Sequence, residues 1–310
     1  MMFVSTRSDG DLKQFDDTLL SALASDGGLY LPAGLPSYSV EKMRELQKLG
    51  YCDLASEILP DLLGSGMPRN DLKDLISSAY AEFDHSAIAP LKSMQSGIWL
   101  LELFHGPTLA FKNFALQLLC RILDYKLSQR GERALIIGAT SGDTGSAAIH
   151  ACKSVKAVDL FMLHPKGRVS DVQRRQMTTV SAPNIHNFAV DGTFDDCQTA
   201  VKALLNDPDL NRVQHVTAVN SVNWTRVAAQ VVYYFYAGLA LGAPDRKIDF
   251  VVPTGDFGNI YAGHVARKMG LSVGNLTIAS NRNDILTRFF ENSSMKTQQV
   301  QPSLTPSMDI

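Results

Sequence analysis

The chain has 310 residues, of which 45% are apolar and 19% are charged, and its 29 basic and 31 acidic side chains leave a net charge of −2. This balance excludes a nucleic-acid binder that works by bulk positive charge, and it equally excludes a disordered acidic chain. The length predicts about two domains, enough to bury a core without disulfides or metals.

Cysteine spacing and the N-terminus bear on the compartment. The four cysteines lie thirty or more positions apart, and no pair has zinc-ligand or redox spacing. We interpret them as reduced packing residues and expect no metal; they are Cys52, Cys120, Cys152 and Cys197. No apolar signal-peptide core follows the start of the chain, so we expect a cytoplasmic protein. Residues 227–243 are apolar but short, and they predict a buried helix and not a membrane span.

Strands and helices alternate from about residue 111 onward. Apolar residues from Phe111 to Leu123 recur at helical spacing and predict a helix with one apolar stripe. Further predicted strands cover 133–138, 157–163, 185–190, 215–219, 248–252 and 276–280, and further predicted helices cover 145–153, 170–178, 194–205, 224–241 and 259–268. This repetition predicts an α/β fold with a parallel sheet, in which ligands bind beyond the carboxyl ends of strands. The residues before 100 predict a separate, less regular N-terminal portion.

The first segment that carries chemistry is 105–114, in which Lys112 lies between two phenylalanines at the start of an apolar helix. Desolvation disfavours an ammonium group, so we expect a lowered pKa and a nucleophilic amine suited to Schiff-base formation. A lysine that extends to water from a helix end is the alternative for this segment taken alone.

Two further segments follow a predicted strand and precede a predicted helix. Residues 138–145 are small and polar, and they offer hydroxyls and backbone amides at a helix N-terminus, which is typical of an anion site. Residues 253–259 offer two glycines in the same position, with Asp256 as a complication for anion binding. Neither segment has a dinucleotide or P-loop fingerprint, which disfavours a nucleotide-binding protein, and each is an ordinary turn on the alternative interpretation.

The three segments together indicate one kind of chemistry. A phosphorylated carbonyl cofactor needs a lysine for a Schiff base and backbone amides for its phosphate, and an amino-acid substrate needs a second anion site for its carboxylate. Pyridoxal 5'-phosphate chemistry meets all three demands.

The chain also resembles the threonine synthase family, of the β-family (fold-type II) pyridoxal-phosphate enzymes, through nearly its whole length. The resemblance rests on blocks in the family's order: 24–32, 102–112, 139–145, 220–224, 255–259, 281–284 and 306–310. It implies a fold-type II α/β architecture with parallel-sheet domains and an additional N-terminal portion. The implied division is an N-terminal domain at 1–95, a small α/β domain at 96–245 and part of a large α/β domain at 246–310.

The resemblance also implies roles for residues. Lys112 would hold the cofactor as an internal aldimine and move protons at Cα and Cβ of the substrate. The cofactor-binding residues implied are Lys112, Asn113, Gly255, Asp256, Phe257, Gly258 and Asn259. The substrate-binding residues implied are Thr140, Ser141, Gly142, Asp143 and Thr144, with Lys166 and Arg168 for the substrate phosphate. For Lys166 and Arg168, a solvated loop is an equal alternative.

The implied reaction is a lyase step of threonine biosynthesis, in which O-phospho-L-homoserine and water give L-threonine and phosphate. An O-phosphohomoserine phospho-lyase that forms 2-oxobutyrate, and a truncated non-catalytic binding protein, stay open as alternatives. We expect a monomer or homodimer with a small-molecule substrate and with neither a nucleic-acid nor a membrane partner. The chain departs from the family at Asn113 and Asp256, where Asp and Asn are usual, and family members usually continue for a hundred or more residues past 310.

Overall fold

The structure is a computed structural model that describes residues 1–8, 10, 12–21, 23–213, 215–218, 223–255, 257–301 and 303–309. The chain forms two compact units. Unit 1 comprises Met1–Gly34 and Gly50–Ala229, and unit 2 comprises Leu35–Leu49 and Gln230–Ile310. The predicted division into three consecutive segments stays a prediction.

Unit 1 is built on a four-stranded parallel sheet in the order β7-β6-β5-β8. The strands are β5 (Ala134–Ala139), β6 (Val158–Pro165), β7 (Ile185–Val190) and β8 (His215–Ala218). Ala139 of β5 pairs with Leu163 of β6, so the two strands reach the same edge of the sheet together. The loops that leave this edge lead into helices, as in other open α/β sheets.

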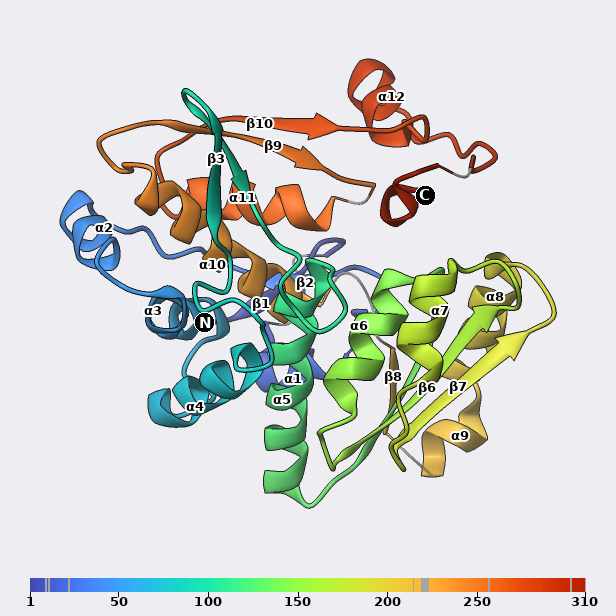
Figure 1. The fold of residues 1–310 in the computed structure, drawn as a ribbon. Helices are drawn as coiled ribbons and strands as arrows, with labels where there is room; N and C mark the ends of the chain where they lie inside the picture. Colours follow the sequence, from blue (N-terminus) through green and yellow to red (C-terminus); the bar gives the residue numbers. More distant parts are fainter. Residues whose placement is uncertain are drawn as a thin grey trace. The chain divides into compact units, whose positions relative to one another are not determined.

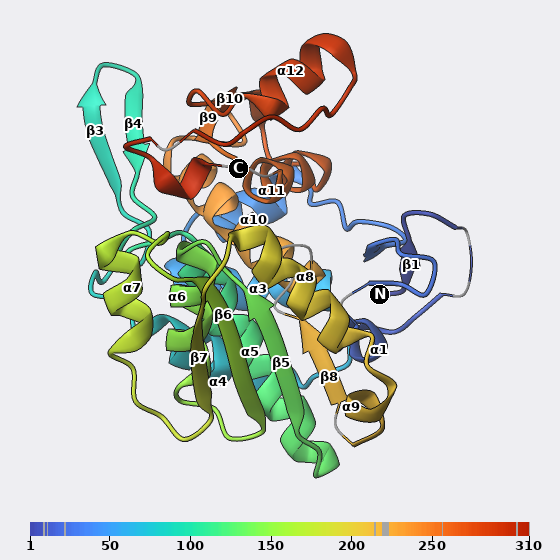
Figure 2. The same cartoon turned by 90° about the vertical axis from the view of Figure 1, so that its right-hand side faces the viewer.

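Helices cover both faces of this sheet (Figure 2). They are α5 (Lys112–Arg130), α6 (Asp143–Cys152), α7 (Asp171–Thr178), α8 (Phe194–Leu205) and α9 (Pro208–Val213). On the face toward α8, Leu135 and Ile137 pack with Val201. On β6, Val158, Leu160 and Met162 are buried, while the alternate residues Phe161 and Leu163 pack with the α8 cluster. This alternation follows the period of two along a strand.

The N-terminal part of unit 1 supplies short strands and helices (Figure 1). They are β1 (Phe3–Ser5), α1 (Phe15–Leu19), β2 (Tyr30–Pro32), α3 (Tyr51–Leu63), α4 (Arg69–Tyr80), and the hairpin of β3 (Leu91–Gln95) and β4 (Ile98–Leu101). Aromatic rings join α3, α4 and α5: Tyr51 and Tyr80 lie 5.1 Å apart, and Phe83 and Phe114 lie 4.7 Å apart. The Tyr80 hydroxyl donates to the carbonyl of Phe114 at 3.2 Å, which fixes the first turn of α5 against α4.

Unit 2 contains a pair of parallel strands, β9 (Ile248–Pro253) and β10 (Val273–Ala279). Its helices are α2 (Val40–Leu46), most of α10 (Trp224–Ala240), α11 (Gly258–Lys268), α12 (Ile285–Asn292) and the short 3-10 helix η1 (Pro306–Met308). Buried residues of α10 and α11, among them Phe235 and Val265, form its core.

The predicted elements agree closely with the observed ones, and those at 185–190 and 194–205 agree to the residue. Ser170 caps α7 as predicted, since its side chain accepts from the Gln173 amide. The helix from Phe111 differs: α5 continues to Arg130, and residues on nearly all its sides are buried, including Arg121 and Lys126. The single apolar stripe was therefore too narrow a prediction, because α5 packs against α4, α6 and the sheet at once.

The structure also bears on the four cysteines and on the buried helix predicted at 227–243. All four thiols are free, and Cys120, Cys152 and Cys197 are buried while Cys52 is partly exposed. Of the predicted helix at 227–243, residues 227–240 lie in α10 and most of them are buried, while the last three residues form a turn. Among the described residues, none of the helices combines the length and the apolar character needed to cross a membrane.

Candidate functional site

The loop between β5 and α6 is organised around the Thr140 side chain. Thr140 Oγ1 accepts from the backbone amides of Gly142 at 3.0 Å and Gly145 at 2.8 Å, and Thr140 is only 2% exposed. Its own amide donates to Leu163 at 2.9 Å, which ties the loop to the end of β6. The Thr140 side chain thus holds the turn together from its buried side, whereas Ser141 is exposed.

At two positions of this loop a neighbouring side chain lies so close to the backbone that only glycine fits. Gly142 has φ 153°, and a Cβ atom there would overlap the side-chain amide of Gln173. A Cβ atom at Gly145 would overlap the Thr140 side chain. The loop therefore keeps a tight backbone conformation with its helix N-terminus at Asp143, which is the geometry of an anion site.

Lys112 is the first residue of α5, and the structure brings it to this loop. Lys112 Nζ donates to Thr144 Oγ1 at 3.0 Å, although the two residues are 32 positions apart. The ammonium group also lies 5.8 Å from the centroid of the Phe111 ring. The Lys112 amine of the segment 105–114 is thus in direct contact with the Thr144 hydroxyl of the segment 138–145.

The segment before α5 is held by its own polar contacts. His105 lies between two carboxylates, with Nε2 2.8 Å from Glu102 and Nδ1 3.2 Å from Asp84. Asn113 is fully buried and donates to Thr108 Oγ1 and to the Ala110 carbonyl, each at 2.8 Å. The Asn113 side chain therefore faces the loop before α5, and its role in cofactor binding stays a prediction.

Lys166 and Arg168 follow β6 and so lie at the same edge of the sheet as the loop after β5. Both are exposed, and Lys166 Nζ lies 3.3 Å from the Asp191 carboxylate. Hydrogen bonds from the Thr193 backbone and side chain lower the pKa of Asp196, and the positive charge of Arg168 adds to this effect. The two cations already have acidic neighbours, and their role toward a substrate phosphate stays a prediction.

The third predicted segment lies in unit 2, between β9 and α11. Helix α11 begins at Gly258 with Phe257 as its N-cap, and its first turn has no acidic residue. Asn259 Oδ1 accepts from the hydroxyls of Tyr233 at 2.6 Å and Tyr234 at 3.0 Å, so the side chain is committed to α10. The role of this turn in binding the cofactor phosphate stays a prediction, and Asp256 lies outside the described residues.

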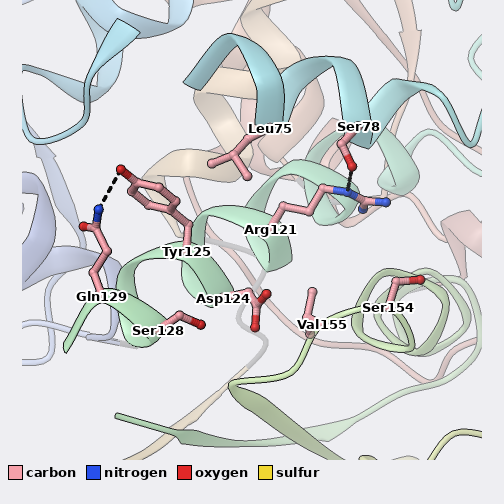
Figure 3. Close-up of a pocket in the computed structure, with 9 residues that line it drawn as sticks. All are labelled: Leu75, Ser78, Arg121, Asp124, Tyr125, Ser128, Gln129, Ser154 and Val155. Carbon is pink, nitrogen blue, oxygen red and sulfur yellow. Dashed lines mark hydrogen bonds between the residues drawn. The ribbon is translucent and has the colours of Figure 1, made fainter. Parts of the chain in front are cut away.

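A surface pocket of about 540 Å³ lies elsewhere in unit 1 (Figure 3). Its lining residues come from α4, α5 and the turn after α6: Leu75, Ser78, Arg121, Asp124, Tyr125, Ser128, Gln129, Ser154 and Val155. Its polar groups bind one another, since Arg121 donates to Ser78 and Gln129 donates to Tyr125. None of the predicted site residues lines this pocket. We therefore place the candidate site at the contact between Lys112 and Thr144 and not in this pocket.

Comparison with known proteins decides the family. Residues 2–80 match the threonine synthase N terminus, and residues 86–310 match the pyridoxal-phosphate dependent enzyme family. The chain is 42% identical to a threonine synthase of Methylobacillus glycogenes over all of this chain and 68% of that protein. The chain belongs to the threonine synthase family of pyridoxal-phosphate dependent enzymes.

Other family members agree in sequence and structure. A threonine synthase of Pseudomonas aeruginosa is 51% identical over all of this chain and 66% of that protein. A solved structure of threonine synthase from Brucella melitensis, described as bound to pyridoxal phosphate, is 48% identical with a TM-score of 0.95 and is covered to 67%. The chain thus has the fold-type II architecture and spans about two thirds of the length of the curated relatives that it matches.

Sequence reasoning missed Gln173, which contacts the loop of this threonine synthase-family chain from α7. Its side chain donates to Asp143, accepts from Ser170 Oγ at 2.8 Å, and packs on Gly142. A signal was present, because Ser followed three residues later by Gln is a capping pattern that predicts a side chain folded back on its helix start.

Proposed function

We propose that this chain binds pyridoxal 5'-phosphate through Lys112 and converts O-phospho-L-homoserine and water to L-threonine and phosphate. The observation that supports this best is the 3.0 Å contact between Lys112 Nζ and Thr144 Oγ1. It joins the amine of the cofactor-lysine motif to the loop that resembles the family's substrate-carboxylate loop.

The residues present fit the cofactor. Lys112 offers a primary amine beside an aromatic ring, and the start of α11 offers backbone amides without an acidic side chain in its first turn. A dianionic phosphate is stabilised by such a helix N-terminus. Gly255, Phe257, Gly258 and Asn259 would bind the phosphate, the last of these through its backbone. When bound, the cofactor supplies a carbonyl group and an electron-withdrawing ring.

The chain's own residues would handle the substrate and its protons. The loop at 140–144 would bind the substrate carboxylate, while Thr140 would maintain the turn through the hydrogen bonds that its side chain accepts from Gly142 and Gly145. Lys112 would remove and return protons at Cα and Cβ, and Thr144 would hold its amine in place by accepting a hydrogen bond. Lys166 and Arg168 would attract the substrate phosphate, as cations at the same sheet edge.

The decisive experiment is cofactor loading of Lys112→Ala. Because only a lysine amine forms the Schiff base, we expect the purified chain to show a visible Schiff-base absorption band and the variant to lack it. Lys156→Ala, which removes an exposed lysine beyond the C-terminal end of α6, is the matched control and should keep the band. A band that persists in Lys112→Ala would overturn the assignment of the cofactor lysine.

The product distinguishes the proposed reaction from that of an O-phosphohomoserine phospho-lyase. Incubation with O-phospho-L-homoserine should release phosphate and L-threonine in equal amounts. Release of phosphate with 2-oxobutyrate instead would identify a phospho-lyase, which begins with the same loss of phosphate.

A binding protein without turnover is a second candidate, and one observation favours it. The parallel pair β9 and β10 leaves Val251 67% exposed, whereas parallel sheets are usually covered on both faces. Stoichiometric cofactor without any product would support this candidate, and turnover would exclude it. For either candidate we propose a cytoplasmic monomer or homodimer that acts on a small molecule, with no nucleic-acid or membrane partner.

A further inference from the structure

The loop after β5 contains a feature that its proposed role does not explain. Asp143 is the first residue of α6, in the middle of a segment proposed to bind a carboxylate. A second carboxylate at close range repels the first unless its charge is engaged elsewhere. The position of Asp143 therefore requires a partner.

Gln173 is that partner. It is the third residue of α7 and 8% exposed, and its Nε2 donates to Asp143 Oδ1. Its Oε1 accepts from Ser170 Oγ at 2.8 Å, which determines which end of the side-chain amide faces Asp143. Ser170 thus orients Gln173, and Gln173 engages the carboxylate of Asp143.

Gln173 also contacts the backbone of the same loop. Its amide group packs on Gly142 so closely that a Cβ atom there would overlap it. Ser146 Oγ donates to the carbonyl of Gly142 at 3.0 Å and lies 3.4 Å from the carbonyl of Gln173. The start of α7 and the start of α6 are therefore joined at the loop itself.

We propose that Gln173 is a positioning residue that directs the Asp143 carboxylate toward α7, and so sets the affinity of the loop at 140–144 for the carboxylate of an amino-acid ligand. This inference rests on the proposed function of that loop. It assigns to α7 a part in ligand selectivity, because a ligand without a carboxylate has no negative charge that Asp143 could repel.

The test compares L-threonine with L-threonine amide, which lacks the carboxylate, by calorimetric titration of the chain after incubation with pyridoxal 5'-phosphate. In Gln173→Glu the amide donor that α7 offers to Asp143 is replaced by a second carboxylate, so we expect the Kd of L-threonine to rise at least about tenfold. The Kd of the amide should change less than about twofold, because it carries no negative charge to be repelled.

Two further variants keep the result interpretable. Asp143→Asn with Gln173→Glu restores one amide-to-carboxylate hydrogen bond with the polarity reversed, and should recover most of the affinity for L-threonine. Val172→Glu places the same charge in the same turn on a side chain that is 65% exposed, and should leave both affinities unchanged.

The outcomes separate this inference from the proposed function. If Gln173→Glu weakens the binding of both ligands equally, or changes the binding of neither, the positioning role is overturned. This holds even when the Schiff-base band and turnover are intact. If the parent chain lacks that band yet binds L-threonine with the expected sensitivity to Gln173→Glu, the inference stands and the proposed reaction falls. A parent chain that loads cofactor but does not bind L-threonine overturns the inference.

Discussion

One hydrogen bond fixes the position of the Lys112 amine, which we propose as the cofactor amine. Thr144 Oγ1 accepts from Lys112 Nζ at 3.0 Å, and the hydroxyl is placed by the first turn of α6. A lysine side chain has several rotatable bonds and high rotamer entropy, so an acceptor in a rigid turn restricts where its amine can act. The position of the amine thus depends on α6 as much as on α5.

Thr144→Val tests this dependence, since it keeps the shape of the side chain but removes the acceptor. We expect turnover to fall about tenfold or more with the Schiff-base band retained, because a less well-placed amine transfers protons less efficiently. Steady-state kinetics of phosphate release would measure the loss. Thr199→Val on α8, whose hydroxyl donates to the Asp195 carbonyl, is the control. Unchanged turnover in Thr144→Val would contradict the role of this contact.

At the scale of elements, two family blocks at the end of the chain form one network. Asp309 accepts from the side chains of Asn281 at 2.8 Å, Asn283 at 2.9 Å and Ser303 at 2.7 Å. Its other oxygen accepts from the Ser303 amide at 2.9 Å. One carboxylate therefore links the segment after α12 to the residues that follow β10. Both of these segments contain little regular secondary structure.

This network predicts a pH dependence. Burial raises the pKa of Asp309, but the hydrogen bonds from Ser303, Asn281 and Asn283 outweigh it and hold the pKa below the ordinary value of 3.8. A carboxylate whose pKa is lower in the folded state stabilises the fold above its unfolded pKa, and that stabilisation is lost as the pH falls through the folded pKa. We therefore expect loosening of residues 281–309 only below about pH 4.

Hydrogen exchange corrected for intrinsic rates would measure this loosening. Asp309→Asn should reduce protection of 281–309 already at neutral pH and remove its dependence on acid. Glu291→Gln, on the exposed side of α12, should keep the behaviour of the parent chain. Equal protection of the parent chain and Asp309→Asn at every pH would argue against the network.

At the scale of the whole molecule, the chain consists of two compact units. Leu118 is fully buried in unit 1, and Met269 is fully buried in unit 2. Both tryptophans, Trp99 and Trp224, belong to unit 1. Their fluorescence therefore reports the unfolding of unit 1, while circular dichroism reports helices of both units.

We expect two unfolding steps in urea. Leu118→Ala should lower the stability of the fluorescence-detected step by about 2–5 kcal/mol, because it leaves a cavity in the core. Met269→Ala should shift only the second step in circular dichroism. A single transition that both substitutions shift equally, by both signals, would show one cooperative unit instead.

Much of the fold could be predicted because its signals are local. Apolar periodicity, the Ser170 cap and small polar turns after strands depend on neighbouring residues, and the predicted elements of the α/β sheet agree with the structure. The segment before residue 100 gave weaker signals, since its strands β1 and β2 have three residues each and its helix α1 has five. Cys120 and Cys152 illustrate the limit: they are 32 positions apart, and their sulfur atoms lie 3.1 Å apart across α5 and α6.

By itself, therefore, the sequence determined the element order, the two turns that we propose as anion sites and the lysine that we propose for the cofactor. Only the tertiary structure decided how these residues are engaged. Lys112 meets Thr144, Asn113 turns to Thr108, and Asp143 is bound by Gln173. Local patterns specify helices and turns within a few residues, whereas the partners of a polar side chain depend on which elements the packed sheet brings together.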